Sequence, residues 1–335
     1  MDDNTLLQVR DLKVYFHLDE GLLKAVDGVD FQVRRQKTLG LVGESGCGKS
    51  VTAQALLRIV PKPGRVEGEI LLQRKRGGPM IDLVGLDPFG AEMRGIRGAE
   101  IAMIFQEPMK AFSPVHTIGN QIEEGILLHA TQDKKEAYEI ALDMLRRVQM
   151  SNPEQRMQEY PHQLSGGMRQ RAMIAMALSC HPSILIADEP STALDVTVQA
   201  QVLRLMKDLQ AELGMAVIFI THDMGVIAEM ADEVAVMYLG RIVEFADVDT
   251  VFHRPTHPYT LELLRSIPTL DREPRTRLTT IEGTVPVPLN LKPGCGFFSR
   301  CRRGTPGLCD RENPPLLEVE PGHWVRCFPQ GIGTG

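Results

Sequence analysis

Long apolar runs, a basic excess and a basic N-terminal leader are all missing from this 335-residue chain, and each absence excludes a class of protein. The longest apolar run, about Met215 to Ile220, falls far short of the roughly 18 residues that a membrane-spanning helix needs. The chain starts with acidic residues, whereas a secretory leader starts with basic ones. With a net charge of −6, it also lacks the basic surface typical of nucleic-acid binders. We therefore expect a folded protein that is soluble or held at a membrane by partners, and that binds no nucleic acid.

Closely spaced cysteines are missing too. Four of the six cysteines lie in the last part of the chain, separated by gaps of five, seven and seventeen residues: Cys295, Cys301, Cys309 and Cys327. Because no leader directs the chain to an oxidising compartment, structural disulfides are not expected. Four thiolates can hold a zinc ion or a [4Fe–4S] cluster, and structural zinc sites usually use pairs about two to four residues apart. The wider gaps leave three interpretations open: an iron–sulfur cluster, a zinc ion or plain thiols.

Strand and helix patterns alternate in two parts of the chain. Residues 38–42 form a short apolar strand, followed by a glycine-rich turn and by a helix from about 49 to 60 that Pro61 ends. Further on, the pattern gives a helix over 195–213 and three apolar strands, at 184–187, 216–220 and 234–238. Such alternation predicts a mostly parallel sheet covered by helices.

The remaining segments are of other kinds. Residues 1–85 begin with a β-rich stretch, and residues 86–175 have a mainly helical pattern, with the clearest helix from about 134 to 150. Asp133 and Glu136 suit the start of that helix as a cap. After residue 256 proline, glycine and arginine become frequent and helical periodicity fades, so we expect a region of different character there.

A phosphate-binding pattern occupies residues 43–50, which read Gly43-Glu44-Ser45-Gly46-Cys47-Gly48-Lys49-Ser50. Its glycines let backbone N–H groups close around phosphate oxygens, and the helix that follows points its positive end at the same anion. In this pattern Lys49 reaches the β- and γ-phosphates, and the Ser50 hydroxyl ligates Mg²⁺. Cys47 is a thiol at a helix start, but we interpret it as filling a small-residue position rather than as a reactive group. The apolar strand before the loop and the helix after it support a nucleotide site.

An acidic pair ends the apolar strand at 184–187. Asp188 can hold Mg²⁺ through water, and Glu189 can orient or deprotonate an attacking water molecule. On its own, the pair also fits a surface-exposed acidic strand end, although less well. Its interpretation therefore depends on the motifs around it.

The stretch Leu164-Ser165-Gly166-Gly167-Met168-Arg169-Gln170-Arg171 lies just upstream of the acidic strand. It resembles the Leu-Ser-Gly-Gly-Gln signature of the ABC ATPase family, with Met168 in place of the glutamine. The Ser165 hydroxyl and the amides of Gly166 and Gly167 form an anion site at a helix start. In the family this motif faces the γ-phosphate held by the opposite subunit, so the resemblance implies that ATP is bound between two chains.

Other elements of the family pattern occur in the expected order. The resemblance implies that Gln106 touches Mg²⁺ and senses a membrane partner, and that His222 contacts the γ-phosphate. It places Asp195, in Thr192-Ala193-Leu194-Asp195, in the D-loop. It also implies that Phe16, rather than Tyr15, stacks on adenine.

The resemblance covers about residues 6–255 and implies an α/β fold. The expected parts are a P-loop NTPase core with a mainly parallel sheet, an antiparallel β subdomain and an inserted helical subdomain at about 86–175. Residues 256–335 would form a C-terminal extension that carries the cysteines. The implied cofactors are ATP and Mg²⁺. Catalysis is assigned to Glu189, His222 and Gln106, and the magnesium ligands are Ser50, Gln106 and Asp188.

The beginning of the extension, residues 252–268, resembles the tail of oligopeptide and dipeptide importer ATPases. His253 and His257 are four residues apart, but Pro255 argues against a helix that presents both to a metal. Importer ATPases with this tail are iron–sulfur carriers, so the resemblance favours a [4Fe–4S] cluster on the four cysteines. The family tail has a histidine before its second cysteine region, where residues 297–300 here read Phe-Phe-Ser-Arg.

The chain therefore resembles the ATP-hydrolysing subunit of an ABC importer of di- or oligopeptides or related small solutes. The resemblance implies a second ATPase chain, identical or paralogous, two transmembrane permease subunits, and an extracytoplasmic solute-binding protein that acts indirectly. It also implies a peripheral position on the cytoplasmic face of the cell membrane.

Other functions remain open at this point. A soluble ABC ATPase, for example one of iron–sulfur assembly, would share the core but lack the long cysteine tail. A non-hydrolysing subunit would have a degenerate site, whereas the four key residues are all present here: Lys49, Asp188, Glu189 and His222. An importer of a non-peptide solute such as nickel or glutathione would share the tail, because the solute is chosen by other subunits.

Overall fold

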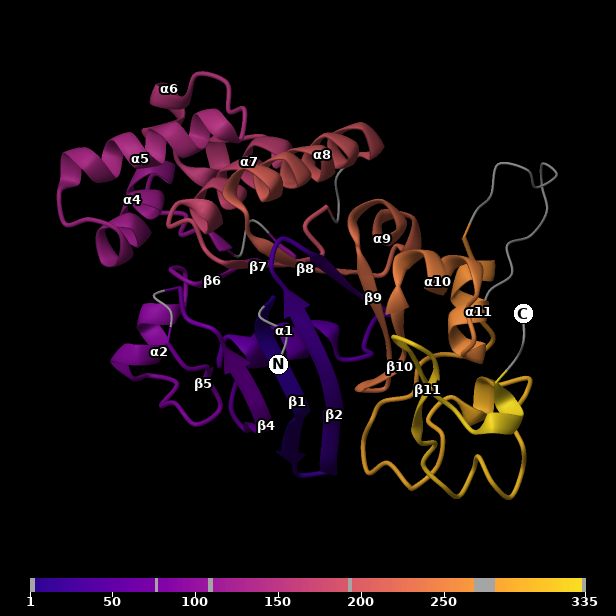
Figure 1. Cartoon of the computed structure of the whole chain (residues 1–335). Helices are drawn as coiled ribbons and strands as arrows, with labels where there is room; N and C mark the ends of the chain where they lie inside the picture. Colours follow the sequence, from indigo (N-terminus) through magenta and orange to yellow (C-terminus); the bar gives the residue numbers. More distant parts are fainter. Residues whose placement is uncertain (1–3, 76–77, 108–110, 192–194, 268–280, 333–335) are drawn as a thin grey trace.

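Two β-sheets and several groups of helices organise the chain (Figure 1). The structure is a computed structural model that describes residues 4–75, 78–107, 111–191, 195–267 and 281–332. Three of the four residues expected to form the D-loop, 192–194, lie outside the described residues. No helix in the described ranges is both long enough and apolar enough to cross a bilayer.

The N-terminal part forms a four-stranded antiparallel sheet in the order β2-β1-β4-β5. Its strands are β1 (Thr5–Leu18), β2 (Gly21–Arg34), β4 (Gly64–Leu72) and β5 (Ile81–Asp82). Alternate apolar residues of β1 and β2, such as Leu7, Val9, Val29 and Phe31, are buried on one face. The antiparallel β subdomain that was predicted is therefore present.

The main sheet has eight strands in the order β11-β12-β10-β9-β3-β8-β7-β6. Its five parallel strands are β3 (Thr38–Val42), β6 (Ile101–Ile104), β7 (Ile184–Asp188), β8 (Ala216–Thr221) and β9 (Glu233–Tyr238). Three antiparallel strands complete it: β10 (Arg241–Asp247), β11 (Leu316–Glu320) and β12 (His323–Arg326). The mainly parallel core sheet is confirmed, and the hairpin β11–β12 extends it.

The main sheet separates two hydrophobic cores. In β7, Ile184 and Ile186 point to the core shared with the N-terminal sheet and α1 (Lys49–Leu56). Leu185 and Ala187 point to the opposite core, which the larger helices cover. All four side chains are fully buried, as expected for a parallel strand with both faces covered.

Five helices gather on one side of the main sheet (Figure 1): α4 (Ile118–His129), α5 (Lys134–Arg147), α6 (Pro153–Met157), α7 (Gly166–Leu178) and α8 (Val196–Leu213). Helix α2 (Ala91–Ile96) lies on the other side with α1, in the core shared with the N-terminal sheet. The Asp133 side chain accepts hydrogen bonds from the backbone N–H groups of Lys135 and Glu136, which confirms the predicted cap. The segment 86–175 is not helical throughout, because it also supplies β6 to the main sheet.

The expected loss of helical structure after residue 256 is wrong at its start. Helices α9 (Met224–Met230) and α10 (Val248–His253) are followed by α11 (Pro258–Arg265), which begins with proline at its first position. Proline suits that position because its missing N–H would have no partner there. His253 ends α10 and His257 caps α11, so the two histidines do not share one helix.

Candidate functional site

The phosphate-binding loop connects β3 to α1 and requires glycine at two positions. Gly43 has φ 156° and Gly48 has φ 107°, in a region that L side chains rarely adopt. A Cβ at Gly43 would lie 2.2 Å from the Met237 carbonyl oxygen, and one at Gly48 would lie 2.3 Å from the Ala25 carbonyl oxygen. The close approach of these backbones therefore fixes the shape of the loop.

Lys49 lies inside this loop. Only 5% of the residue is exposed, and its ammonium group donates to the carbonyl oxygens of Gly43 at 2.7 Å and Glu44 at 3.1 Å. Loop and lysine thus form one rigid unit at the start of α1. A positive group beside the helix N-terminus suits a phosphate group.

Ser50 and Asp188 bring a magnesium-type donor set together. The Ser50 hydroxyl donates to the Asp188 carboxylate at 3.1 Å. Burial raises the pKa of Asp188, the adjacent Glu189 raises it further, and Ser50 and Lys49 lower it. A bound cation would instead favour the ionised carboxylate. Hydroxyl and carboxylate oxygens are the ligands that Mg²⁺ prefers, so these residues fit the ion.

Glu189 is the meeting point of the residues assigned to catalysis. Its carboxylate accepts from the Gln106 side-chain amide at 3.1 Å, and its other oxygen lies 3.1 Å from Nδ1 of His222. Its backbone has φ 48°, which is uncommon for a residue with a side chain, and its N–H donates to Ile220 at 2.9 Å. Strain of this kind persists where the surrounding structure enforces it, and it gathers at functional sites.

A cavity of about 520 Å³ lies over the loop, within the range of small-molecule sites. Residues predicted for the nucleotide site line it: Phe16, Ser45, Gly46, Gly48, Lys49, Ser50, Gln106 and Glu189. The neighbouring Tyr15 does not line it, because its hydroxyl donates to Asp27 instead. The geometry therefore favours Phe16 over Tyr15 as the aromatic residue facing a ligand.

One wall of this cavity was not predicted. Residues 285–288 of the C-terminal extension line it. They are held by long-range backbone contacts: Lys24 N–H donates to the Pro288 carbonyl at 2.9 Å, and Asn290 N–H donates to the Leu22 carbonyl at 2.9 Å. The sequence shows only a proline-rich stretch there, and no local pattern signals a contact with β2.

The signature residues lie elsewhere on the molecule. Ser165 caps α7 by accepting from Met168 N–H at 3.3 Å, and Asp195 caps α8 by accepting from Val198 N–H at 3.0 Å. Ser165, Gly166 and Asp195 are exposed, and none of them lines the cavity above the loop. The two helix starts adjoin, since a Cβ on Gly167 would lie 3.2 Å from the Val198 side chain.

Cys47 is buried and has the features of an inert thiol. The residue is fully shielded from solvent, and burial raises its pKa. A thiol that stays protonated is a poor nucleophile. This agrees with its interpretation as a small residue of the loop.

The four late cysteines surround one small, closed cavity of about 20 Å³. Burial raises the pKa of the Cys327 thiol to about 12, and the other three cysteines add to the effect. None of the four forms a disulfide. In the described part of the chain, however, no group of three or more His, Cys, Asp or Glu side chains is arranged to hold a metal ion. Four thiols around one cavity fit a thiolate-bound centre in chemistry, although they are not placed at ligand positions.

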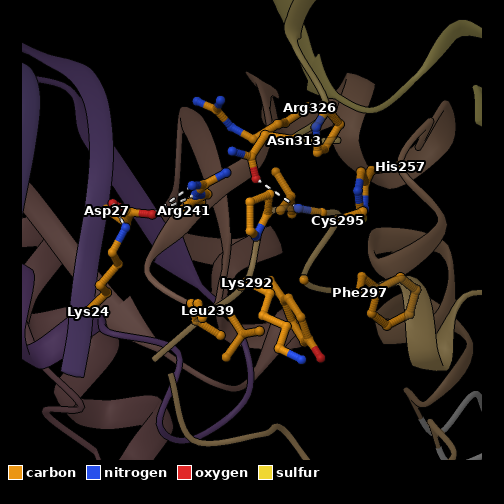
Figure 2. Close-up of a pocket in the computed structure, with 17 residues that line it drawn as sticks. Lys24, Asp27, Leu239, Arg241, His257, Lys292, Cys295, Phe297, Asn313 and Arg326 are labelled. Atoms are coloured by element: carbon orange, nitrogen blue, oxygen red, sulfur yellow. Dashed lines mark hydrogen bonds and ion pairs between the residues drawn. The ribbon is translucent and has the colours of Figure 1, made fainter. Parts of the chain in front are cut away.

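A second cavity, of about 150 Å³, borders the cysteine region (Figure 2). The ion pair between Arg241 and Asp27, at 2.6 Å, lies on one side, and His257 and Phe297 lie on the other beyond Cys295. Asn313 also lines it and accepts a hydrogen bond from Gly294 N–H at 3.2 Å. The extension thus packs on β2 and β10 rather than standing apart from them.

Comparisons with known proteins agree with this geometry. Residues 26–192 match the family described as ABC transporter, and residues 243–309 match the one described as oligopeptide/dipeptide transporter, C-terminal region. The fold and the site define an ATPase of the ABC type. The chain belongs to the family of ABC transporter ATP-binding proteins, and it carries the C-terminal region of oligopeptide/dipeptide transporters.

Individual relatives match over nearly the whole chain. It is 50% identical to the probable peptide ABC transporter ATP-binding protein y4tR of Sinorhizobium fredii, and the match covers 96% of this chain and 94% of the relative. It is also 50% identical to the oligopeptide transport ATP-binding protein AppD of Bacillus subtilis, with 97% of each chain covered. A dimeric bacterial ABC transporter cassette, MJ0796, is 25% identical, with a TM-score of 0.62 over 72% of this chain and 98% of that one.

Proposed function

We propose that this chain hydrolyses ATP to energise the import of di- or oligopeptides, as a peripheral subunit on the cytoplasmic face of the cell membrane. The observation that carries the ATPase part is the convergence of Gln106 and His222 on Glu189, which lines the cavity over the phosphate-binding loop. The peptide part is supported by relatives that are half identical over nearly their whole length and are named for peptide transport. The alternatives, a soluble ABC ATPase or a non-peptide importer, lack such support.

Each residue of the site has a role in the proposed reaction. Lys49 and the loop amides bind the β- and γ-phosphates, and Phe16 stacks on the adenine ring. Glu189 orients and deprotonates the water that attacks the γ-phosphate, while His222 contacts that phosphate. Magnesium, held by Ser50, Gln106 and Asp188, would neutralise phosphate charge.

We further propose that two ATPase chains enclose each ATP. The signature residues Ser165, Gly166 and Gly167, together with Asp195, lie outside the cavity of their own chain, so they are available to a second one. Light scattering of the Glu189→Gln variant with MgATP should report a dimer, and adding Ser165→Arg should return it to a monomer. A dimer that Ser165→Arg leaves intact would contradict this arrangement. A monomer throughout would restrict the partner to a paralogous chain.

Transport is tested with the whole assembly. The chain, its companion ATPase and two permease subunits are placed in liposomes with a solute-binding protein, and uptake of labelled peptides is measured. Peptide should stimulate both uptake and ATP hydrolysis, and Lys49→Ala should abolish both. Stimulation by nickel or glutathione but not by peptides would reassign the solute. No association with any permease would instead favour a soluble ABC ATPase.

For the extension, we propose that Cys295, Cys301, Cys309 and Cys327 hold a [4Fe–4S] cluster. Support comes from the single cavity that they line and from the oligopeptide/dipeptide-type region around them. We also propose that the chain divides into two parts. Residues 1–255 form the ATPase part, with a helical subdomain at about 86–175, and residues 256–335 form the extension. When bound, a cluster would join four separate positions of the extension through iron–thiolate bonds.

The cluster is tested by purifying the chain without oxygen. Broad absorption at about 400 nm, with about four irons and four sulfides per chain, is the expected result for this cluster type. One zinc ion in a colourless protein would replace the cluster with a structural zinc site. Absence of metal after reconstitution would leave plain thiols.

A further inference from the structure

Arg300 is a buried arginine that links the cysteine region to the phosphate-binding loop. It ends the short 3₁₀ turn Phe298–Arg300, directly before Cys301. Only 4% of its side chain is exposed, whereas Arg302, two residues further on, is 63% exposed. A buried guanidinium requires partners for its charge and its N–H groups.

The partners of Arg300 satisfy its whole guanidinium group. Nη1 donates to Oε2 of Glu44 at 2.7 Å, and Nη2 donates to Oε1 at 2.9 Å, so the two side chains form a two-pronged ion pair. The other donors reach oxygen atoms of Glu282 at 2.9 Å, Gly283 at 3.3 Å and Tyr238 at 3.4 Å. Five N–H groups thus have five acceptors. A lysine could not reproduce this geometry.

Glu44 is held at its backbone as well. Its N–H donates to the Tyr259 hydroxyl at 2.8 Å, and its carbonyl oxygen accepts from Lys49 at 3.1 Å and from Cys47 N–H at 3.3 Å. Tyr259 belongs to α11, so the two partners of Glu44 from outside the loop, Tyr259 and Arg300, both come from residues after position 256. A loop residue that contacts Lys49 is therefore fixed from the C-terminal extension.

Aromatic rings hold Arg300 in place. Its guanidinium lies 5.9 Å from the ring centres of both Tyr238 and Phe297. The rings of Tyr238, Tyr259 and Phe297 pack on one another, with centres 4.7 to 5.3 Å apart. This cluster holds the arginine in one position before a ligand binds. Less conformational entropy is then lost on binding, because the arginine and the loop residue that it contacts are already ordered.

We propose that Arg300 is a positioning residue for nucleotide binding, which acts by fixing the phosphate-binding loop through Glu44. The C-terminal extension then contributes to ATP affinity, in addition to marking the transporter type. The inference rests on the proposed role of residues 43–50 as the nucleotide site. Arg300 does not line the nucleotide cavity, so it acts through the shape of the loop.

The test uses the full chain and compares Arg300→Ala with the exposed control Arg302→Ala. Arg300→Ala should raise the Kd and the KM for MgATP about tenfold, the effect of losing a hydrogen-bonded charged partner. The kcat should change less, because Glu189 and His222 are untouched. Arg300→Lys should recover only part of the affinity, and Arg302→Ala should match the unmodified chain.

A double-mutant cycle with Glu44→Gln sharpens the result. Since both changes disrupt one pair, the double variant should be little worse than Arg300→Ala alone. Fully additive losses, or an unchanged KM in Arg300→Ala, would overturn the proposal. Should Arg300→Ala fail to fold, Glu44→Gln removes the same charge pair with a side chain of equal size and decides the question alone.

Lys49→Ala separates this inference from the proposed nucleotide site. If Lys49→Ala abolishes ATP binding while Arg300→Ala and Glu44→Gln leave it unchanged, only the role of Arg300 is wrong. If Lys49→Ala retains normal ATP binding, the nucleotide site itself is misplaced.

Discussion

The nucleotide site and the four-cysteine site are built in different ways. Asp188 ends β7, His222 follows β8 directly, and Gln106 lies two residues after β6, so parallel strands deliver these side chains to the carboxyl end of the main sheet. The cysteines lie on loops and short turns of the extension. Rigid strand ends place polar groups before any ligand arrives, whereas burial raises the pKa of the Cys295, Cys301 and Cys327 thiols and so favours their protonated form until something ionises them. We therefore expect the nucleotide site to keep its structure when its ligand is removed. We expect the structure of the four-cysteine site to depend on a bound ligand.

The largest expected effect is on catalysis at the preformed site. Glu189→Gln should lower the kcat for ATP hydrolysis by roughly 10²–10⁴-fold, because a positioned base is lost, while ATP affinity is retained. Phosphate release measured at saturating MgATP tests this, with binding followed separately. If the variant kept activity near the original level, another residue would be the base. The nucleotide site would then not be preformed around Glu189.

The next effect concerns the ligand-dependent site. Cys301→Ser should remove the proposed metal centre and lower the thermal midpoint of unfolding, since one of its four proposed ligands would be missing. Cys180→Ser is the matched control, because this half-buried cysteine lies away from the cavity and contacts Gly125 instead. Metal analysis and calorimetry of both variants supply the comparison. Equal metal content in the two would show that the four thiols do not form a metal site.

A smaller effect is expected from the adenine side of the nucleotide cavity. Phe16→Ala should weaken MgATP binding by about 1–3 kcal/mol, the scale of stacking between a base and an aromatic ring. Tyr15→Ala should leave binding nearly unchanged, because the Tyr15 side chain does not line the nucleotide cavity. Calorimetric titration distinguishes the two. The reverse order would assign the stacking role to Tyr15.

The smallest effect is on stability in acid, at the junction of the two regions. Burial opposes ionisation of Asp27, but hydrogen bonds from Tyr15 and Arg241 outweigh it, so the pKa of Asp27 lies below its usual value. Its contribution is therefore present above the unfolded pKa of about 3.9 and is lost as pH falls through the lower folded value.

Asp27→Asn should remove about 1.5 kcal/mol of unfolding free energy at pH 7, and less at pH 3. Urea unfolding at both pH values measures the difference. Asp249→Asn, at an exposed position in the first turn of α10, is the control and should show a smaller loss. An equal loss at both pH values for Asp27→Asn would indicate packing rather than charge.

The same contrast explains how much the sequence could predict. The phosphate-binding loop and the acidic strand end are local patterns, so the sequence predicted them and also the parallel strands around them. Helix α11 was missed because two prolines flank its start, and the hairpin β11–β12 because its pairing with β10 spans about 80 residues. Residues 285–288 and the pair of Glu44 and Arg300 were missed for the same reason, since 256 positions separate that pair.

The hairpin β11–β12 has one further consequence. Its second strand pairs with β10, where Glu244 lies opposite Val325 and Phe245 opposite Trp324. Without it, β10 would be an edge strand with a free row of backbone N–H and C=O groups, a template for aggregation between molecules. A chain cut after residue 255 would keep every motif for ATP and yet expose that edge. The extension therefore replaces β10 at the sheet edge with β11, a short strand that carries Glu318 and Glu320, two features that disfavour pairing with a strand of another molecule.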